Sequence, residues 1–151
     1  MPVEIQLSSS LADNVYVPSK ELFVVWVGAV LRKQAIDEAE LSIRIVDESE
    51  SQDLNKEYRD KNTPTNVLSF SLGVPEYVMP RILGDLVICA EVVAVESQTQ
   101  DKPRDAHWAH MVVHGVLHLL GFDHQADEQA QQMEGLEIEV MQGLGFANPY
   151  E

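Results

Sequence analysis

Three histidines have the types and spacing of a metal site: His114 and His118 are four residues apart, and His124 follows after a glycine at position 121. In a helix, side chains four residues apart lie on one face, where two imidazoles can bind the same ion. Gly121 can end that helix and let the chain turn back, so that His124 supplies a third ligand. Three protein ligands leave a fourth position for water, which is typical of a catalytic zinc site. The ion would lower the pKa of that water and provide hydroxide at neutral pH.

The spacing of the three histidines resembles that of the metzincin proteases, but the residue after the first histidine differs. Those proteases carry a glutamate there as the general base, whereas this chain has Gly115. The pattern therefore weighs against a peptidase, unless another carboxylate replaces the base. A glycine inside a helix costs about 1 kcal/mol relative to alanine, so we expect a bulky substrate or another backbone element to approach the helix at that point.

Two further histidines, His107 and His110, lie on nearly the same stripe of the expected helix as His114. One hypothesis is that they shuttle protons or hydrogen-bond to a metal ligand. The other is that they are ordinary histidines that face the cleft or the surface. A single histidine without a motif does not decide between the two.

The elements that must position these residues follow from the hydrophobic periodicity. Four strands are expected, at residues 3–7, 41–45, 67–71 and 82–89, the last interrupted at Gly84-Asp85. Five helices are expected, at residues 18–33, 49–59, 90–100, 104–120 and 126–144. Residues 49–52 (SESQ) have the spacing of a capping box that would start the second helix. The interspersed order indicates a single domain over residues 1–151, of the α+β or α/β class with a small sheet.

The charge of the chain is strongly negative and unevenly distributed. Ten Lys and Arg stand against 25 Asp and Glu, a net charge of −15, which argues against a protein that coats nucleic acid through phosphate contacts alone. Lys56, Arg59 and Lys61 lie close together and form either a solvated surface group or a local anion site. No Lys or Arg follows Arg104. The acidic residues of the tail are expected on a solvated helix face; they are Asp127, Glu128, Glu134, Glu137, Glu139 and Glu151.

Other features favour a cytoplasmic protein without a membrane span. The start of the chain lacks the basic and apolar regions of a signal peptide. The longest apolar run, residues 22–31, is too short to cross a bilayer as a helix. Cys89 is the only cysteine, so no intrachain disulfide is possible, and we expect it to be a small buried hydrophobe.

The run from His114 to His124 (HGVLHLLGFDH) resembles the signature of the YbeY family, the bacterial endoribonucleases of ribosomal RNA maturation. Two other segments agree with that family: residues 55–59 (NKEYR) leading to 63–70 (TPTNVLSF), and residues 83–88 (LGDLVI). The resemblance covers about residues 41–150. It departs at Phe122, where many members have tyrosine.

This resemblance implies a zincin-like α+β fold, with a small mixed sheet, about five helices and a central metal-binding helix. It implies one Zn²⁺ on His114, His118 and His124, although three imidazoles also suit another divalent metal. It implies hydrolysis of phosphodiesters in single-stranded RNA, at the 3′ end of 16S ribosomal RNA and in ribosome quality control. Ribosomal RNA and the ribosome, or proteins associated with it, are then the expected partners.

The conserved arginine of that family maps onto Arg59, which we expect to clamp phosphoryl oxygens through paired hydrogen bonds. Asp85 lies inside an apolar strand and needs a partner. It is expected either to orient a metal-bound histidine or act on the attacking water, or to make a buried structural hydrogen bond. Asp123 is expected at the helix end or beside a ligand. Thr65 and Asn66 suit either RNA contacts or a tight turn before a strand.

Two other functions stay open at this point. One is a metallopeptidase-like hydrolase on a related scaffold, against which Gly115 weighs. The other is a non-catalytic ribosome-associated factor with a structural zinc, against which the open fourth ligand position weighs.

Overall fold

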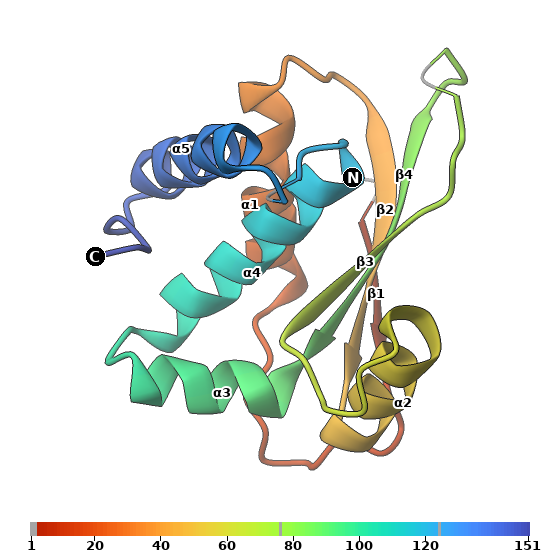
Figure 1. Cartoon of the computed structure of the whole chain (residues 1–151), viewed down its shortest axis with the longest axis vertical. Coiled ribbons are helices and arrows are strands. Elements are labelled where there is room, and N and C mark those ends of the chain that lie inside the picture. The colour runs from red at the N-terminus through yellow and green to blue at the C-terminus, as the bar shows by residue number, and fades with distance from the viewer. Residues whose placement is uncertain (1–2, 76, 124) are drawn as a thin grey trace.

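The computed structural model describes residues 3–75, 77–123 and 125–151, and its strands form one mixed sheet in the order β1-β2-β4-β3 (Figure 1). Strands β1 (Val3–Leu7), β2 (Ala39–Val46) and β4 (Arg81–Cys89) run parallel. Strand β3 (Val67–Ser71) closes one edge, antiparallel to β4. The expected α+β class with a small mixed sheet is confirmed.

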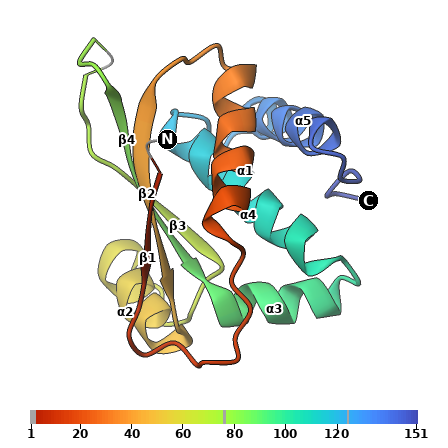
Figure 2. The same cartoon turned by 180° about the vertical axis from the view of Figure 1, so that it is seen from behind.

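The described helices lie on both sides of this sheet. They are α1 (Lys20–Lys33), α2 (Glu48–Arg59), α3 (Ala90–Thr99), α4 (Arg104–Leu119) and α5 (Asp127–Gly143). Figures 1 and 2 show α1, α4 and α5 on one side, whereas α2 covers part of the opposite face. Helix α4 contacts α1, α3, α5, β3 and β4, so it has the expected central position. Within the described residues, no helix is long and apolar enough to cross a membrane.

Side chains alternate between the two faces of the sheet along each strand, so the core is divided into two clusters. On one face, Leu86 and Ile88 of β4 pack with Ile43 and Ile45 of β2 in the larger cluster, which includes residues of α1 and α4. On the other face, β4 residues join a small cluster beside α2, formed by Val46, Leu68, Val87 and Cys89. Cys89 is fully buried, and burial raises the pKa of its thiol, so the expectation of a small buried hydrophobe is confirmed.

Strand β4 is continuous, and the expected interruption at Gly84-Asp85 is an irregularity in its pairing instead. The register with β2 shifts between Glu40 and Leu41, opposite the step to Gly84. Gly84 has φ +137°, and a Cβ atom there would lie 2.1 Å from the carbonyl oxygen of Phe70. Only glycine tolerates that backbone and that close approach.

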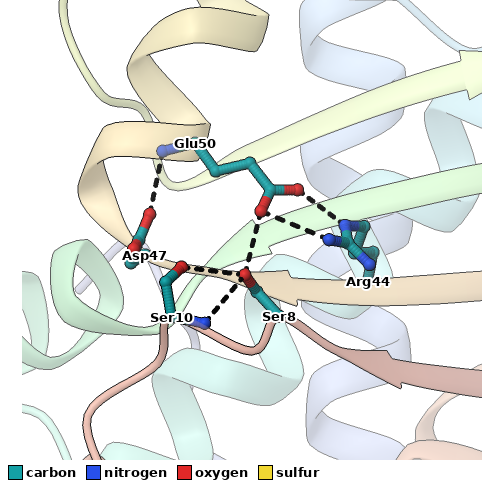
Figure 3. Close-up of polar contacts among 5 residues, drawn as sticks. All are labelled: Ser8, Ser10, Arg44, Asp47 and Glu50. Atoms are coloured by element: carbon teal, nitrogen blue, oxygen red, sulfur yellow. Dashed lines mark hydrogen bonds and ion pairs between the residues drawn. The ribbon is translucent and has the colours of Figure 1, made fainter.

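Helix α2 is anchored by a polar network at its start (Figure 3). The expected capping box at Ser49 is wrong: the N-cap is Asp47, whose carboxylate accepts a hydrogen bond from the backbone N–H of Glu50 at 2.8 Å. The side chain of Glu50 accepts from Arg44 of β2, at 2.6 Å from Nε, and from the hydroxyl of Ser8 at 3.0 Å. These bonds fasten α2 to β2 and to the turn that follows β1.

Candidate metal centre and its cleft

Helix α4 places His114 and His118 side by side along one wall of a cleft. Their ring centroids are 4.6 Å apart, with the ring planes at 78°. Both side chains are partly exposed and line a cleft of about 750 Å³. The one-turn spacing therefore brings the two imidazoles together as the sequence predicts.

The end of α4 turns the chain back toward this cleft. Gly121 has φ +99°, and its N–H donates to the carbonyl oxygen of His118 at 3.0 Å. The N–H of Phe122 donates to the carbonyl oxygen of Leu117 at 3.1 Å, which completes a Schellman motif. Phe122 and Asp123 then line the cleft.

The third predicted ligand, His124, lies outside the described residues, so its role stays a prediction. Within residues 3–75, 77–123 and 125–151, no group of three or more potential metal ligands is found. The two described histidines thus form part of the predicted ligand set.

The opposite wall of the cleft comes from the end of α2 and from the segment that leads into β3. Arg59, Thr65 and Asn66 line the same cleft as His114 and His118, although they are far from these histidines in the sequence. Arg59 is the one Lys or Arg among the described lining residues, since Lys56 and Lys61 do not reach the cleft. The structure therefore brings a single described cation to the histidines.

Two buried polar residues of α2 hold the segment that carries Thr65. The hydroxyl of Ser51 donates to the carbonyl oxygen of Thr65 and accepts from its N–H, both at 3.0 Å. The side-chain amide of Asn55 donates to the carbonyl oxygen of Thr63 at 2.8 Å. Sequence reasoning missed both residues, although their spacing of four on one helix face was a visible signal.

A second network holds Asn66 at the start of β3. Its side-chain oxygen accepts from the N–H of Val67 at 2.7 Å, and its amide donates to Glu96 at 3.1 Å. The same carboxylate accepts from Nε2 of His107 at 2.9 Å, and this bond is the main cause that lowers the pKa of Glu96. His107 is buried and does not line the cleft, so it supports the cleft wall from behind.

Glu137 of α5 lies behind His114 and is fully buried, at 0% exposure. Nδ1 of His114 donates to Oε1 of Glu137, and the hydroxyl of Tyr150 donates to Oε2. Nε2 of His110 lies 3.5 Å from Oε2. Burial alone would raise the pKa of Glu137, but the interactions with His110, His114 and Tyr150 outweigh it and lower the pKa to about 2.

The expectation that Glu137 belongs to a solvated helix face is therefore wrong. It falls on the buried stripe of α5 with Met133, Val140 and Met141, and that spacing was the signal in the sequence. The other acidic residues named for that face are exposed: Asp127, Glu128, Glu134, Glu139 and Glu151.

The side chains of this wall fit a divalent ion. Because Nδ1 of His114 is hydrogen-bonded to Glu137, a metal at this ring would have to bind through Nε2. Metal-binding histidines usually donate their other N–H to a carboxylate or carbonyl group, which fixes the ring and its tautomer. Imidazole nitrogens are also the ligands that zinc prefers beside thiolates.

Asp85 is not brought to the histidines. It projects from β4 on the same face as Val87, which is opposite to the face that Leu86 presents to α4. Its carboxylate accepts a hydrogen bond from the hydroxyl of Ser42, and it lines a separate hollow of about 630 Å³. This placement suits the structural hydrogen bond, and the catalytic role of Asp85 stays a prediction.

Gly115 packs against the sheet, away from the cleft. A Cβ atom there would lie 2.7 Å from Cδ2 of Leu86, which is itself fully buried. A close approach at this position is confirmed, but the nearest atoms belong to the side chains of Leu86 in β4 and Val67 in β3 and not to a backbone element. A glutamate at this position would collide with β4, so the peptidase-type base has no room here.

Comparisons with known proteins bear on the family and on the fold. The family model described as endoribonuclease YbeY matches residues 12–145. Among solved structures, the solution structure of TM1509 from Thermotoga maritima is similar with a TM-score of 0.59 and 23% sequence identity. That similarity covers 95% of this chain and 91% of TM1509, and at this identity it concerns the fold alone.

Proposed function

Because this chain belongs to the YbeY family of endoribonucleases, we propose that it cleaves single-stranded RNA with a divalent metal held on α4. The observation that carries the proposal is one cleft lined by His114, His118 and Arg59. The first two have the chemistry of metal ligands, and the third has the chemistry of a phosphate clamp. Zn²⁺ is the proposed ion, with His124 as the third ligand.

The described side chains have different roles in the proposed hydrolysis of a phosphodiester. A divalent ion held there would supply water of lowered pKa and Lewis-acid stabilisation of a phosphoryl group. His114 and His118 would hold that ion through imidazole nitrogens. Arg59 pairs its N–H groups with phosphoryl oxygens and stabilises the negative charge that grows in the transition state. Thr65 and Asn66, fixed by Ser51 and Glu96, contact the RNA backbone along the same wall.

The charge of the molecule favours a substrate that is delivered by a larger assembly. At physiological salt, a surface charge acts over about 8 Å, so Arg59 can attract a phosphate although the net charge is −15. One described cation in the cleft gives little affinity for naked RNA. We therefore infer that the ribosome or its proteins supply much of the binding, in the cytoplasm, during maturation of the 16S 3′ end and ribosome quality control.

The test is an assay of the purified protein on a single-stranded RNA and on the matching duplex, with chelator and then with added zinc. We expect cleavage of the single strand only, loss of cleavage in chelator and recovery with zinc. Full cleavage in the presence of chelator would contradict a metal-dependent reaction. Cleavage of casein without cleavage of RNA would favour the metallopeptidase, and an inactive protein with a tightly bound ion would favour the non-catalytic ribosomal factor.

A further inference from the structure

A buried carboxylate behind the metal ligands has no part in the chemistry described so far. The carboxyl group of Glu137 is fully buried, and none of its described partners is a lysine or arginine. Burying a polar carboxyl group is costly unless neighbouring groups form hydrogen bonds with it. An apolar side chain of similar volume is often no less stable, so packing alone does not account for a glutamate at this place.

Each carboxylate oxygen of Glu137 forms a hydrogen bond with a different partner. Oε1 accepts from Nδ1 of His114, and Oε2 accepts from the hydroxyl of Tyr150. His114 is the partner that reaches the cleft. The carboxylate thus links a buried position on α5 to a ring that is proposed to bind metal on α4.

The segment after α5 holds Tyr150 against this carboxylate. The Tyr150 ring packs edge-to-face on His110, with centroids 5.4 Å apart and ring planes at 83°. The amine of Lys102 donates to the carbonyl oxygen of Pro149, and the N–H of Tyr150 donates to the side-chain oxygen of Asn148 at 2.8 Å. The phenol is therefore placed by contacts other than its bond to Glu137.

We propose that Glu137, held in place by Tyr150, is a positioning residue that fixes His114 with its proton on Nδ1 and with Nε2 as the metal-binding atom. The nitrogen that carries the proton is set by the hydrogen bond that the ring makes. A ring fixed in this way does not have to reorient or change tautomer when it binds an ion. This inference rests on the proposed function, because it takes His114 as a ligand.

The test measures zinc affinity and the tautomer of His114 in separate experiments. Zinc dissociation constants come from competition with a chromophoric chelator, and tautomers come from ¹⁵N–¹H correlation spectra of the metal-free protein, with His114→Ala for assignment. The variants are Glu137→Met, which removes the acceptor but keeps the volume, Glu137→Gln, which keeps an acceptor oxygen, and Tyr150→Phe. Controls are Glu134→Gln on the exposed face of α5 and Tyr77→Phe at an exposed tyrosine.

The metal-free wild type is expected to show His114 protonated on Nδ1. In Glu137→Met that signature is lost and the zinc dissociation constant rises about 10- to 100-fold, as for other partners of metal-binding histidines. Glu137→Gln retains the signature and a tighter site than Glu137→Met. Tyr150→Phe weakens zinc binding less than Glu137→Met does, and both controls bind like the wild type.

Wild-type affinity in folded Glu137→Met, or His114 protonated on Nε2 in the wild type, would overturn the proposal. If Glu137→Met does not fold, Tyr150→Phe and the wild-type spectrum decide: unchanged affinity in Tyr150→Phe overturns the part assigned to that residue. If the wild type binds no zinc while His114 carries its proton on Nδ1, the proposed metal function fails and the orientation of the ring by Glu137 stands.

Discussion

Arg59 is the described residue that most directly connects the cleft to a phosphodiester. It is the last residue of α2, is exposed, and lines the same cleft as His114 and His118. Its guanidinium offers paired donors that match two phosphoryl oxygens, which the single ammonium group of a lysine does not reproduce. Its contribution should therefore depend on geometry as well as charge.

Replacement of Arg59 tests this role. We expect Arg59→Ala to lower kcat for RNA cleavage by about 10²- to 10³-fold, the usual effect of losing one donor to a transition state, with metal content unchanged. Arg59→Lys should recover only part of the rate. Arg32→Ala makes the same charge change at an exposed position of α1 and should leave the rate as in the wild type. A rate in Arg59→Ala equal to that in Arg32→Ala contradicts the clamp.

The residues that could be predicted from the sequence are those whose partners are close along the chain or belong to a known motif. His114 and His118 share a helix face because of their spacing. The resemblance to the YbeY family singled out Arg59, which lines the same cleft. Glu137 and Glu96 were not predicted as supporting residues, because their partners are 23 and 11 residues away. Only the packing of α3, α4 and α5 reveals such contacts.

At the scale of elements, α4 can carry the histidines on one face because its other face packs closely on β4. Gly115 permits that packing, since Leu86 occupies the place of a side chain. Most elements were predictable from periodicity, as the agreement for α1, α4 and β3 shows. The start of α2 was not, because Asp47 and Ser49 both have N-cap chemistry and only the backbone shows which one is used.

The contact at Gly115 predicts an unusual response to alanine. In most helix interiors, Gly→Ala stabilises a protein by up to about 1 kcal/mol. At Gly115 the added methyl group meets fully buried Leu86, so we expect Gly115→Ala to lower the free energy of unfolding by about 1–2 kcal/mol, as for an overpacked core. Gly135→Ala in α5, where no atom lies within 4 Å of the added carbon, is the matched control and should be stabilising. Urea unfolding measures the free energy of unfolding of both variants. Equal stabilisation by both substitutions would show that Leu86 of β4 moves aside at little cost.

The anchor of α2 predicts a pH-dependent contribution to stability. The hydrogen bond from Arg44 is the main cause that lowers the pKa of Glu50. A lowered pKa in the folded state stabilises the protein above the ordinary pKa of glutamate, about 4.3, and this contribution is lost as the pH falls below it. We expect Glu50→Gln to lower the free energy of unfolding by about 0.5–1 kcal/mol at pH 7, as for a partly exposed ion pair.

The difference between wild type and Glu50→Gln should shrink between pH 4.5 and pH 3, a window about the ordinary glutamate pKa. Urea unfolding followed by circular dichroism at several pH values measures it. Glu57→Gln, at an exposed position of the same helix, is the control and should have little effect at any pH. A difference that is constant with pH would show that the Glu50 carboxylate does not stabilise the anchor.

At the scale of the whole molecule, an acidic protein presents one described cation in its cleft. This distribution suits a nuclease that acts on RNA held elsewhere and does not suit one that binds long stretches by itself. The helices α2 and α4 lie on opposite faces of the mixed sheet (Figure 1). The cleft is lined by the end of α2, by α4 and by the edge strand β3.

The affinity for free RNA should consequently be low and only weakly dependent on salt. For single strands, the slope of log affinity against log salt is about −0.7 per phosphate neutralised, so one to three contacts predict a slope between about −0.7 and −2. Fluorescence anisotropy with a labelled single strand over a range of KCl concentrations measures it. Tight binding to random RNA with a slope steeper than about −4 would contradict delivery of the substrate by the ribosome.

A comparison of two proteins shows whether RNA cleavage depends on the metal bound at His114. Metal content and cleavage of single-stranded RNA are measured for the wild type and for His114→Ala, each purified in the same way. We predict one divalent ion per wild-type chain, and loss of both the ion and RNA cleavage in the variant. A variant that loses the ion but cleaves RNA at the wild-type rate would contradict a metal-dependent active site at His114, because the cleavage would then come from elsewhere.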